Sequence, residues 1–259
     1  MSPDYFDIHS HIHDKAFDET RDSVLTRMEE NNVWTITVGT DAESSKNAIL
    51  LAEERDGVYS TIGIHPTDRV EDFNKEIFEN LVKNKSVVAI GECGLDYFRF
   101  KTDSDGEKQR QKNLFEKQLE FAVLNNLPLM IHCRDAHGDI TDILKSRKRE
   151  YGEKLRANIH FFTAGVEEAR KYLDFDFTLS FPGVITFTTD YDGVVRFAPL
   201  NRIMSETDSP YVAPVPYRGK VNEPVYVVEV VKRIAEIKNE NFNKTKETLV
   251  ANAIRFFDV

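Results

Sequence analysis

The sequence predicts an α/β protein that forms a single (β/α)8 TIM barrel with additional helices closing its C-terminal side. Three observations support this prediction. The length of 259 residues is typical of one such barrel. Short apolar segments of strand type alternate with longer segments of helical periodicity, and polar residues of one chemical kind recur where the apolar segments end. We therefore expect one domain that spans residues 1–259.

The expected strands are short runs rich in β-branched and aromatic residues, which favour extended structure. The first contains Tyr5, Phe6 and Ile8, and the second, at 33–39, ends in Gly39. The complete set of expected strands lies at residues 5–8, 33–39, 58–64, 87–91, 127–131, 155–159, 175–180 and 203–207.

The expected helices separate these strands and show apolar residues three and four positions apart. The segment 17–31 offers Val24, Leu25 and Met28 for packing, and Asp135 is placed to cap the helix that runs to about Lys148. The expected helices lie at residues 17–31, 41–54, 73–83, 109–126, 135–148, 165–172, 221–237 and 244–257. Residues 95–108 form the longest expected loop, and long loops on barrels tend to be functional.

Composition limits the classes of protein that need to be considered. The chain is 41% hydrophobic and 30% charged, with no stretch that predicts a membrane segment or signal peptide, so we expect a soluble cytoplasmic protein. Cys93 and Cys133 are too few for a disulfide framework and fit a reducing compartment. The net charge of −10 argues against a broad basic surface that coats nucleic acid, although it permits a small basic mouth around a cationic metal centre.

The segment Asp7–His13 is the first site candidate. His9 and His11 are two residues apart in an expected strand, so their imidazoles point to the same face and can share one metal ion. The alternative is one surface histidine and one core histidine. The rest of the chain favours the metal site because it supplies more ligand-type residues at later strand ends.

Six polar residues each follow an expected strand, and the strand ends of a parallel barrel lie on one face, so these side chains should converge. They are His11, His65, Glu92, His132, His160 and Asp208. Nitrogen and carboxylate donors without thiolate suit Zn, Mn or Mg. Six donors exceed the needs of one catalytic ion and indicate two divalent ions bridged by a carboxylate, an arrangement suited to phosphoester hydrolysis.

The ordered motifs resemble the TatD family of metal-dependent deoxyribonucleases, within the amidohydrolase-like barrels, along almost the whole chain. The matching segments are Asp7–His11, Gly63–Pro66, Ala89–Tyr97, His132–Ala136, His160–Phe162 and Glu206–Pro210. The resemblance implies that His9, His11 and Asp208 hold one ion. It further implies that His132 and His160 hold a second ion, that Glu92 bridges the two, and that His65 contacts the substrate. The segment Arg218–Pro224 also resembles the family, with Val221 where a basic residue is frequent.

Roles follow for the individual site residues. Asp208 is expected to be a metal ligand and general base, the alternative being a helix N-cap. Arg134 is expected to bind phosphate, the alternative being an ion pair along its helix. Arg218, with Lys220 and Arg99, provides further phosphate contacts, while His65 protonates or positions the leaving oxygen.

Other residues keep two interpretations. Tyr97, taken as a substrate-binding residue, and Phe98 either stack a base or cover the top of the barrel. Glu206 either orients a ligand histidine or is a structural carboxylate, and His137 either contacts substrate or is a surface histidine. Strand alternation directs Cys93 and Cys133 away from the site, so we expect them to pack in the core.

The predicted function is that of a phosphodiesterase with two divalent ions, a deoxyribonuclease with a 3′–5′ exonuclease-like preference for free or single-stranded ends. The expected partner is DNA or another phosphodiester, and the expected state is a monomer. One alternative is a metal-dependent hydrolase of a small ester, lactone or cyclic amide, since the barrel fold does not determine the substrate. Another is a catalytically idle metal-binding scaffold.

Overall fold

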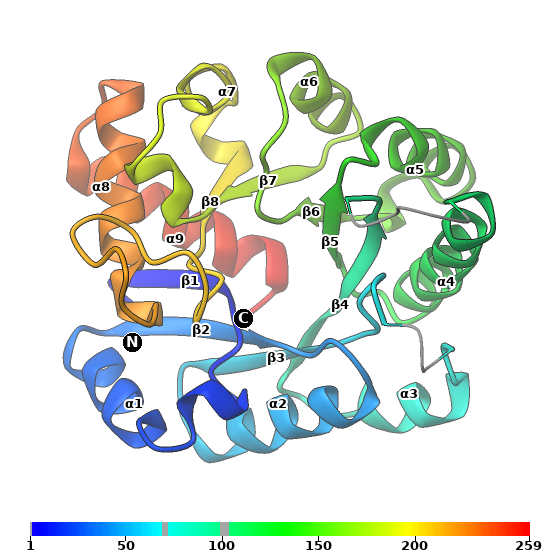
Figure 1. The fold of residues 1–259 in the computed structure, drawn as a ribbon, viewed down its shortest axis with the longest axis horizontal. Coiled ribbons are helices and arrows are strands. Elements are labelled where there is room, and N and C mark those ends of the chain that lie inside the picture. Colours follow the sequence, from blue (N-terminus) through cyan, green and yellow to red (C-terminus); the bar gives the residue numbers. More distant parts are fainter. Residues whose placement is uncertain (1, 69–71, 99–103) are drawn as a thin grey trace.

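A computed structural model describes residues 2–68, 72–98 and 104–259 of the chain. Eight parallel strands follow one another around a nearly closed barrel in the order of the sequence, as Figure 1 shows. The strands are β1 (Tyr5–Ser10), β2 (Val33–Val38), β3 (Val58–Ile62), β4 (Val87–Asp96), β5 (Leu129–Arg134), β6 (Ala157–Ile159), β7 (Thr178–Phe181) and β8 (Ile203–Ser205). The predicted TIM barrel is confirmed.

Helices between the strands form an outer layer. They are α1 (Arg21–Glu30), α2 (Ala42–Glu54), α3 (Lys75–Leu81), α4 (Ser104–Leu124), α5 (His137–Tyr151), α6 (Val166–Asp174), α7 (Asp192–Phe197), α8 (Val227–Lys238) and α9 (Phe242–Phe257). Within the described ranges, every helix is too short or too polar to span a bilayer.

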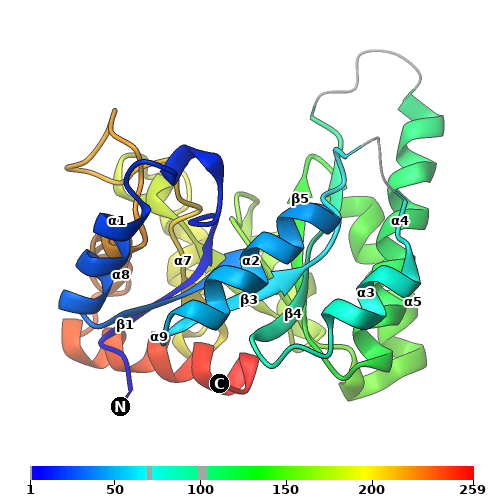
Figure 2. The same cartoon turned by 90° about the horizontal axis from the view of Figure 1, so that it is seen from below.

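Apolar packing occupies two layers. Between the strands and the outer helices lies a large buried cluster that includes Ile90, Leu129 and Leu179. A second buried cluster contains Met130 and Met204 together with Phe257 of α9. Figure 2 shows α9 along the side opposite the loops that follow the strands, so this helix closes the bottom and leaves the other end open for a site.

The connection after β4 is shorter than the predicted loop at 95–108. Strand β4 continues to Asp96 because it pairs with β5 as far as Arg134, and α4 begins at Ser104. Asp105 and Glu107 occupy the first turn of α4, where negative side chains interact favourably with the helix dipole. The predicted loop was therefore wrong at both of its ends, and residues 99–103 within it lie outside the described residues.

Three helix predictions also need correction. Asp135 does not cap α5, because it has a positive φ of 54° and Ala136 precedes the helix without a side-chain cap. The helix expected from residue 221 begins as a 3-10 turn at Pro224–Tyr226 and continues as α8. The short helix α7 was not predicted, and the helix expected at 17–31 is α1, which covers Arg21–Glu30, while Phe17 belongs to a 3-10 turn at Lys15–Phe17.

The pairing of β4 with β5 shifts in register between Ile90 and Cys93, in the segment that contains Glu92. The backbone N–H of Glu92 donates to the carbonyl of Gly39 rather than to β5. Two residues later, Gly94 has a φ of 140°, and a Cβ at this position would overlap the carbonyl oxygen of His132. Only glycine allows this close approach of β4 to β5, which brings Glu92 and His132 to the same end of the barrel.

The barrel seam between β8 and β1 is closed mainly by individual hydrogen bonds. The buried carboxylate of Asp7 accepts from the N–H of Thr207 at 2.8 Å and from its hydroxyl at 2.6 Å. Nearer the open end, the N–H of Asp208 donates to the carbonyl of His9 at 2.8 Å, and that of His11 donates to Ser209 at 2.7 Å. The seam thereby holds Asp208 beside the two histidines of β1.

Candidate metal centre

The predicted ligand residues line one cavity of about 990 Å³ at the open end of the barrel. The lining includes His11, His65, Glu92, His132, His160 and Asp208. His9 lies beneath this surface, fully buried, with its Nε2 3.3 Å from Nε2 of His11. The structure thus brings together every residue for which the sequence predicted a metal-binding role.

Glu92 lies between two groups of histidines and presents one carboxylate oxygen to each. Its Oε2 is 3.6 Å from Nε2 of His9 and 3.9 Å from Nε2 of His11. Its Oε1 is 2.9 Å from both Nδ1 of His132 and Nε2 of His160. A carboxylate in this position can bridge two cations.

The first group of donors comprises His9, His11 and Asp208. The Oδ1 atom of Asp208 lies 3.6 Å from Nε2 of His9 and 3.5 Å from Nε2 of His11. On the far side of its ring, Nδ1 of His11 is 2.9 Å from the carbonyl oxygen of Val38, which orients Nε2 into the cavity. These three side chains can hold one metal ion.

The second group surrounds the other oxygen of Glu92. Nδ1 of His132 and Nε2 of His160 are 3.4 Å apart, and Nε2 of His65 is 3.4 Å from Oε1 of Glu92. His65, Glu92 and His132 form another set that can hold a metal ion. The ring of His65, which is 20% exposed and held by Thr67 at 2.8 Å, lies on the cavity side of this group.

Two carboxylates that position the site were not recognised in the sequence. Oδ2 of Asp96 lies 3.0 Å from Nε2 of His132 and so orients the nitrogen that faces Glu92. Strand alternation places Asp96 on the face of Glu92, but the sequence prediction assigned it to a loop. Asp7 shares the face of His9 and His11 in the same way, and its role in the seam depends on Thr207, far along the chain.

Glu206 both contacts a ligand histidine and accepts structural hydrogen bonds, so it has features of each of the two predicted roles. One oxygen accepts from the N–H of Phe161 at 2.6 Å and lies 3.5 Å from Nδ1 of His160, while the other accepts from Ser180 at 2.6 Å. Together with His9 and His160 it forms a third group with metal-binding geometry. Because its oxygens are already engaged by Phe161 and Ser180, we assign Glu206 to orientation of His160 rather than to a cation.

The electrostatics of the site favour ionised carboxylates. Burial opposes ionisation of Glu92, yet His65 and His160 hold its pKa well below the usual range. Burial likewise opposes ionisation of Asp208, and the hydrogen bond with His11 and the charge of His9 lower its pKa. Burial disfavours protonation of His160, but Glu92 and Glu206 raise its pKa.

The donor set fits divalent cations on three grounds. Its charged oxygens and imidazole nitrogens converge from several strands at 2.9 to 3.9 Å. Their other sides are held by neighbours such as Val38 and Asp96, as in metal sites whose ligands are oriented from behind. Within the described part of the chain, the buried Nδ1 atom of His9 has no hydrogen-bond partner. No neighbour therefore forces the proton onto Nε2, and Nε2 is free to bind a cation.

The predicted substrate contacts are distributed unevenly. Arg134 lines the cavity and lies over the ring of Phe98, 3.6 Å from its centroid. Tyr97 is outside the lining, and its hydroxyl donates to Asp139 at 2.8 Å. Arg218 is also outside the lining; it donates to the carbonyl of Ala213 and lies over Phe187, while Arg99 falls outside the described residues.

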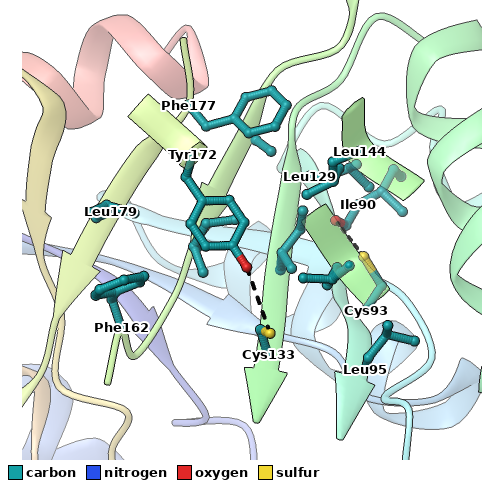
Figure 3. Close-up of a cluster of buried hydrophobic side chains, with 14 of the residues drawn as sticks. Ile90, Cys93, Leu95, Leu129, Cys133, Leu144, Phe162, Tyr172, Phe177 and Leu179 are labelled. Atoms are coloured by element: carbon teal, nitrogen blue, oxygen red, sulfur yellow. Dashed lines mark hydrogen bonds between the residues drawn. The ribbon is translucent and has the colours of Figure 1, made fainter. Parts of the chain in front are cut away.

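The two cysteines belong to the layer between strands and helices, as Figure 3 shows. Burial raises the pKa of Cys93, and burial raises that of Cys133 to about 12, so both are thiols at neutral pH. Sγ of Cys133 is 3.3 Å from Nδ1 of His137, which also contacts the hydroxyl of Tyr172 at 2.8 Å. The predicted core packing is confirmed for Cys93, whereas Cys133 is buried in the same layer but also lines the cavity. His137 is partly buried and lines the cavity as well, which favours the interpretation that it contacts substrate.

A TIM barrel with this carboxylate and histidine centre at the carboxyl ends of its strands defines a metal-dependent hydrolase. Residues 6–258 match the model of the family described as TatD related DNase. The chain is 37% identical to the metal-dependent hydrolase YabD of Bacillus subtilis, covering 98% of this chain and 99% of the relative. It is 32% identical to the metal-dependent hydrolase YcfH of Escherichia coli, over 98% and 95% of the two chains.

Among solved structures, YJJV, a TatD homologue from Escherichia coli, superposes with a TM-score of 0.89 at 25% identity over the full length of both chains. A TatD family hydrolase from Entamoeba histolytica has the same fold, with a TM-score of 0.86 at 22% identity over 99% and 98% of the chains. The chain belongs to the family of TatD related DNases and is a metal-dependent hydrolase.

Proposed function

We propose that this hydrolase cleaves phosphodiester bonds in DNA and that two divalent ions bind in its cavity. The observation that carries the proposal is the position of Glu92, whose Oε1 and Oε2 face different groups of histidines. His9, His11 and Asp208 would hold one ion and His132 with His160 the other. Such a pair of ions supplies positive charge for both the attacking and the leaving oxygen of an in-line displacement at phosphorus.

Asp208 is the proposed general base. Its carboxylate lies at the cavity surface, and its lowered pKa keeps it charged at neutral pH, so it can accept a proton from the attacking water. His65 lies on the other side of Glu92, where it can orient or protonate the leaving oxygen. Arg134 at the cavity wall pairs with a non-bridging phosphoryl oxygen.

The shape and charge of the molecule favour strand ends as substrates. A cavity enclosed by barrel loops admits the end of a strand more readily than the middle of a duplex, and the net charge of −10 opposes contact with a long polyanion. We propose 3′–5′ exonuclease action on free or single-stranded ends. Tyr97 and Arg218 are not at the cavity wall, so their proposed contacts are with more distant nucleotides.

The proposal extends to the state of the protein. We propose an active monomer of one domain, because this single chain supplies all the proposed ligands. Both cysteines are free and buried, as expected of a protein that works in the reducing cytoplasm.

The test is incubation of metal-reconstituted protein with end-labelled single-stranded and double-stranded oligonucleotides, followed by analysis of the product ladder. Stepwise shortening from the 3′ end, absent in Glu92→Gln, supports the proposal. Hydrolysis of small esters or lactones without any cleavage of DNA would identify a small-molecule hydrolase instead. Metal binding without turnover of any of these substrates would identify a scaffold.

A further inference from the structure

Exposed aromatic side chains gather around the cavity. Large hydrophobic side chains are exposed at only a few positions in the described ranges, and the aromatic ones among them are Phe98, Phe187 and Tyr211. Phe98 is 55% exposed and Tyr211 is 56% exposed, yet both line the cavity that contains Glu92. Both rings therefore lie where a ligand bound in the cavity can cover them.

These two rings lie on opposite sides of the cavity. Phe98 follows β4 and Tyr211 follows β8, and the ring order of the strands places β4 across the barrel from β8. Figure 1 shows the same separation, with β4 beside β5 and α4, and β8 beside α8 and α9. The proposed ions lie between the two rings, so groups on either side of a central phosphate would meet one ring each.

The guanidinium of Arg134 contacts the ring of Phe98 but leaves much of the side chain exposed. The guanidinium of Arg134 lies 3.6 Å from the ring centroid, and more than half of the Phe98 surface is still exposed. Its neighbour Tyr97 differs, because its hydroxyl donates to Asp139 and Lys108 lies over its ring. Phe98 therefore offers the stacking surface on this side, with the positive charge of Arg134 beside it.

Tyr211 is held in place by its main chain. Its N–H donates to the carbonyl of Asp208 at 2.9 Å, and its own carbonyl accepts from Nδ2 of Asn222 at 2.6 Å. Its ring meets the ring of His11 edge to face, with centroids 6.2 Å apart. The ring is thus fixed next to the first group of donors while its exposed surface is available to a ligand.

We propose that two stacking walls hold unpaired nucleobases on either side of the scissile phosphate. One wall is Phe98 with Arg134, and the other is Tyr211. The inference rests on the proposed function and adds how the nucleic acid is recognised. Aromatic rings stack on any base because every base has a π face, so recognition is independent of sequence. Bases in the middle of a duplex are already stacked on both faces, so the two walls select single strands and frayed ends.

The experiment compares two short single-stranded probes with equal numbers of phosphates, an oligodeoxyadenylate and a strand with abasic sites in place of every base. Binding is measured by fluorescence anisotropy with protein in EDTA, so that no hydrolysis occurs. The ratio of the two affinities cancels the charge contribution common to both probes. The variants are Phe98→Ala, Tyr211→Ala and Tyr211→Phe, with Leu124→Ala as the control, because Leu124 is exposed outside the cavity.

Wild-type protein should bind the base-containing strand more tightly than the abasic strand. Phe98→Ala and Tyr211→Ala should each weaken binding of the base-containing strand by about 5- to 150-fold and lower the affinity ratio accordingly. Tyr211→Phe and Leu124→Ala should retain the ratio. A probe with 2-aminopurine should be quenched on binding to wild type and less quenched with either alanine variant, and circular dichroism confirms that each variant is folded.

Equal binding of both probes by wild type, no binding of either, or equal losses on both probes in the alanine variants would overturn the inference. These outcomes are distinguishable from failure of the proposed function. Preferential binding of the base-containing strand supports the stacking walls even if no strand is hydrolysed. Hydrolysis of both strands with the same kcat/KM supports phosphodiesterase activity and contradicts the stacking walls.

Discussion

Replacement of Glu92 by glutamine is the most direct perturbation of the centre. Glu92 lies within 3.9 Å of imidazole nitrogens from both donor groups, so both proposed ions lose a charged ligand in Glu92→Gln. Asp208 contacts His9 and His11, so Asp208→Asn should affect the ion held by that group. The two variants therefore predict different numbers of weakened sites.

The expected stabilisation by metal follows from mass action. An ion at about 100 times its Kd stabilises the folded state by about 2.7 kcal/mol, and two independent ions by about 5 kcal/mol. For a chain of this size, that corresponds to an increase in Tm of roughly 10–20 °C. If each affected site binds about 100-fold more weakly, Glu92→Gln retains about 1 kcal/mol and Asp208→Asn about 3 kcal/mol at the same metal concentration.

The assay is differential scanning calorimetry with and without metal, combined with metal analysis of the dialysed protein. Each variant is compared with its own metal-free Tm, so that effects of substitution on intrinsic stability cancel. Glu223→Gln is the matched control, because Glu223 is paired with Arg27 outside the cavity and should keep the full shift. Equal shifts for Glu92→Gln and Asp208→Asn, or one ion per wild-type chain, would refute the bridging arrangement.

Three further predictions concern turnover, packing and substrate contact. Asp208→Asn should fold normally and lower turnover of DNA by about 100-fold or more through loss of the general base, and turnover within a few-fold of wild type would exclude this role. Cys93→Ala and Cys133→Ala should each lower the free energy of unfolding by about 1–2 kcal/mol in urea titrations, and a specific loss of activity in folded protein would contradict their packing role. Single-strand binding should show a log–log salt slope of roughly −1.5 to −3, smaller in magnitude by about 0.7 in Arg134→Ala, whereas a slope near −7 or nicking of closed circular DNA would indicate a long-footprint endonuclease.

The sequence predicted the site best where the composition of each strand and the geometry of a parallel barrel lead to the same arrangement. Each strand was recognisable from its composition, and parallel strands in a barrel necessarily bring their carboxyl ends together, so the convergence of Glu92, His132 and Asp208 could be predicted without coordinates. The alternation of strands also placed Cys93 correctly on the helix side of β4.

Features that depend on contacts between distant segments could not be predicted in this way. The extension of β4 to Asp96 requires pairing with β5, and the role of Asp7 requires Thr207. The short helix α7 has only six residues, and Asp192 at its start is fixed by both oxygens to Arg233 of α8, each at 2.8 Å. In all these cases the decisive partner is set by the fold and leaves no periodic signal in the local sequence.

The seam between β8 and β1 affects how the closed circle of strands can open. Among the described strands, β1 and β8 are neighbours joined by an isolated bridge at Ser10 and Ser209 rather than by a ladder, so local opening should begin between them. An ion shared by His9, His11 and Asp208 would tie the two ends of the ring together. Amide hydrogen exchange at His11, Thr207 and Asp208 should then slow on metal addition more than exchange within the β4–β5 ladder. The exchange rates of these three amides would report directly on closure of the seam between β8 and β1.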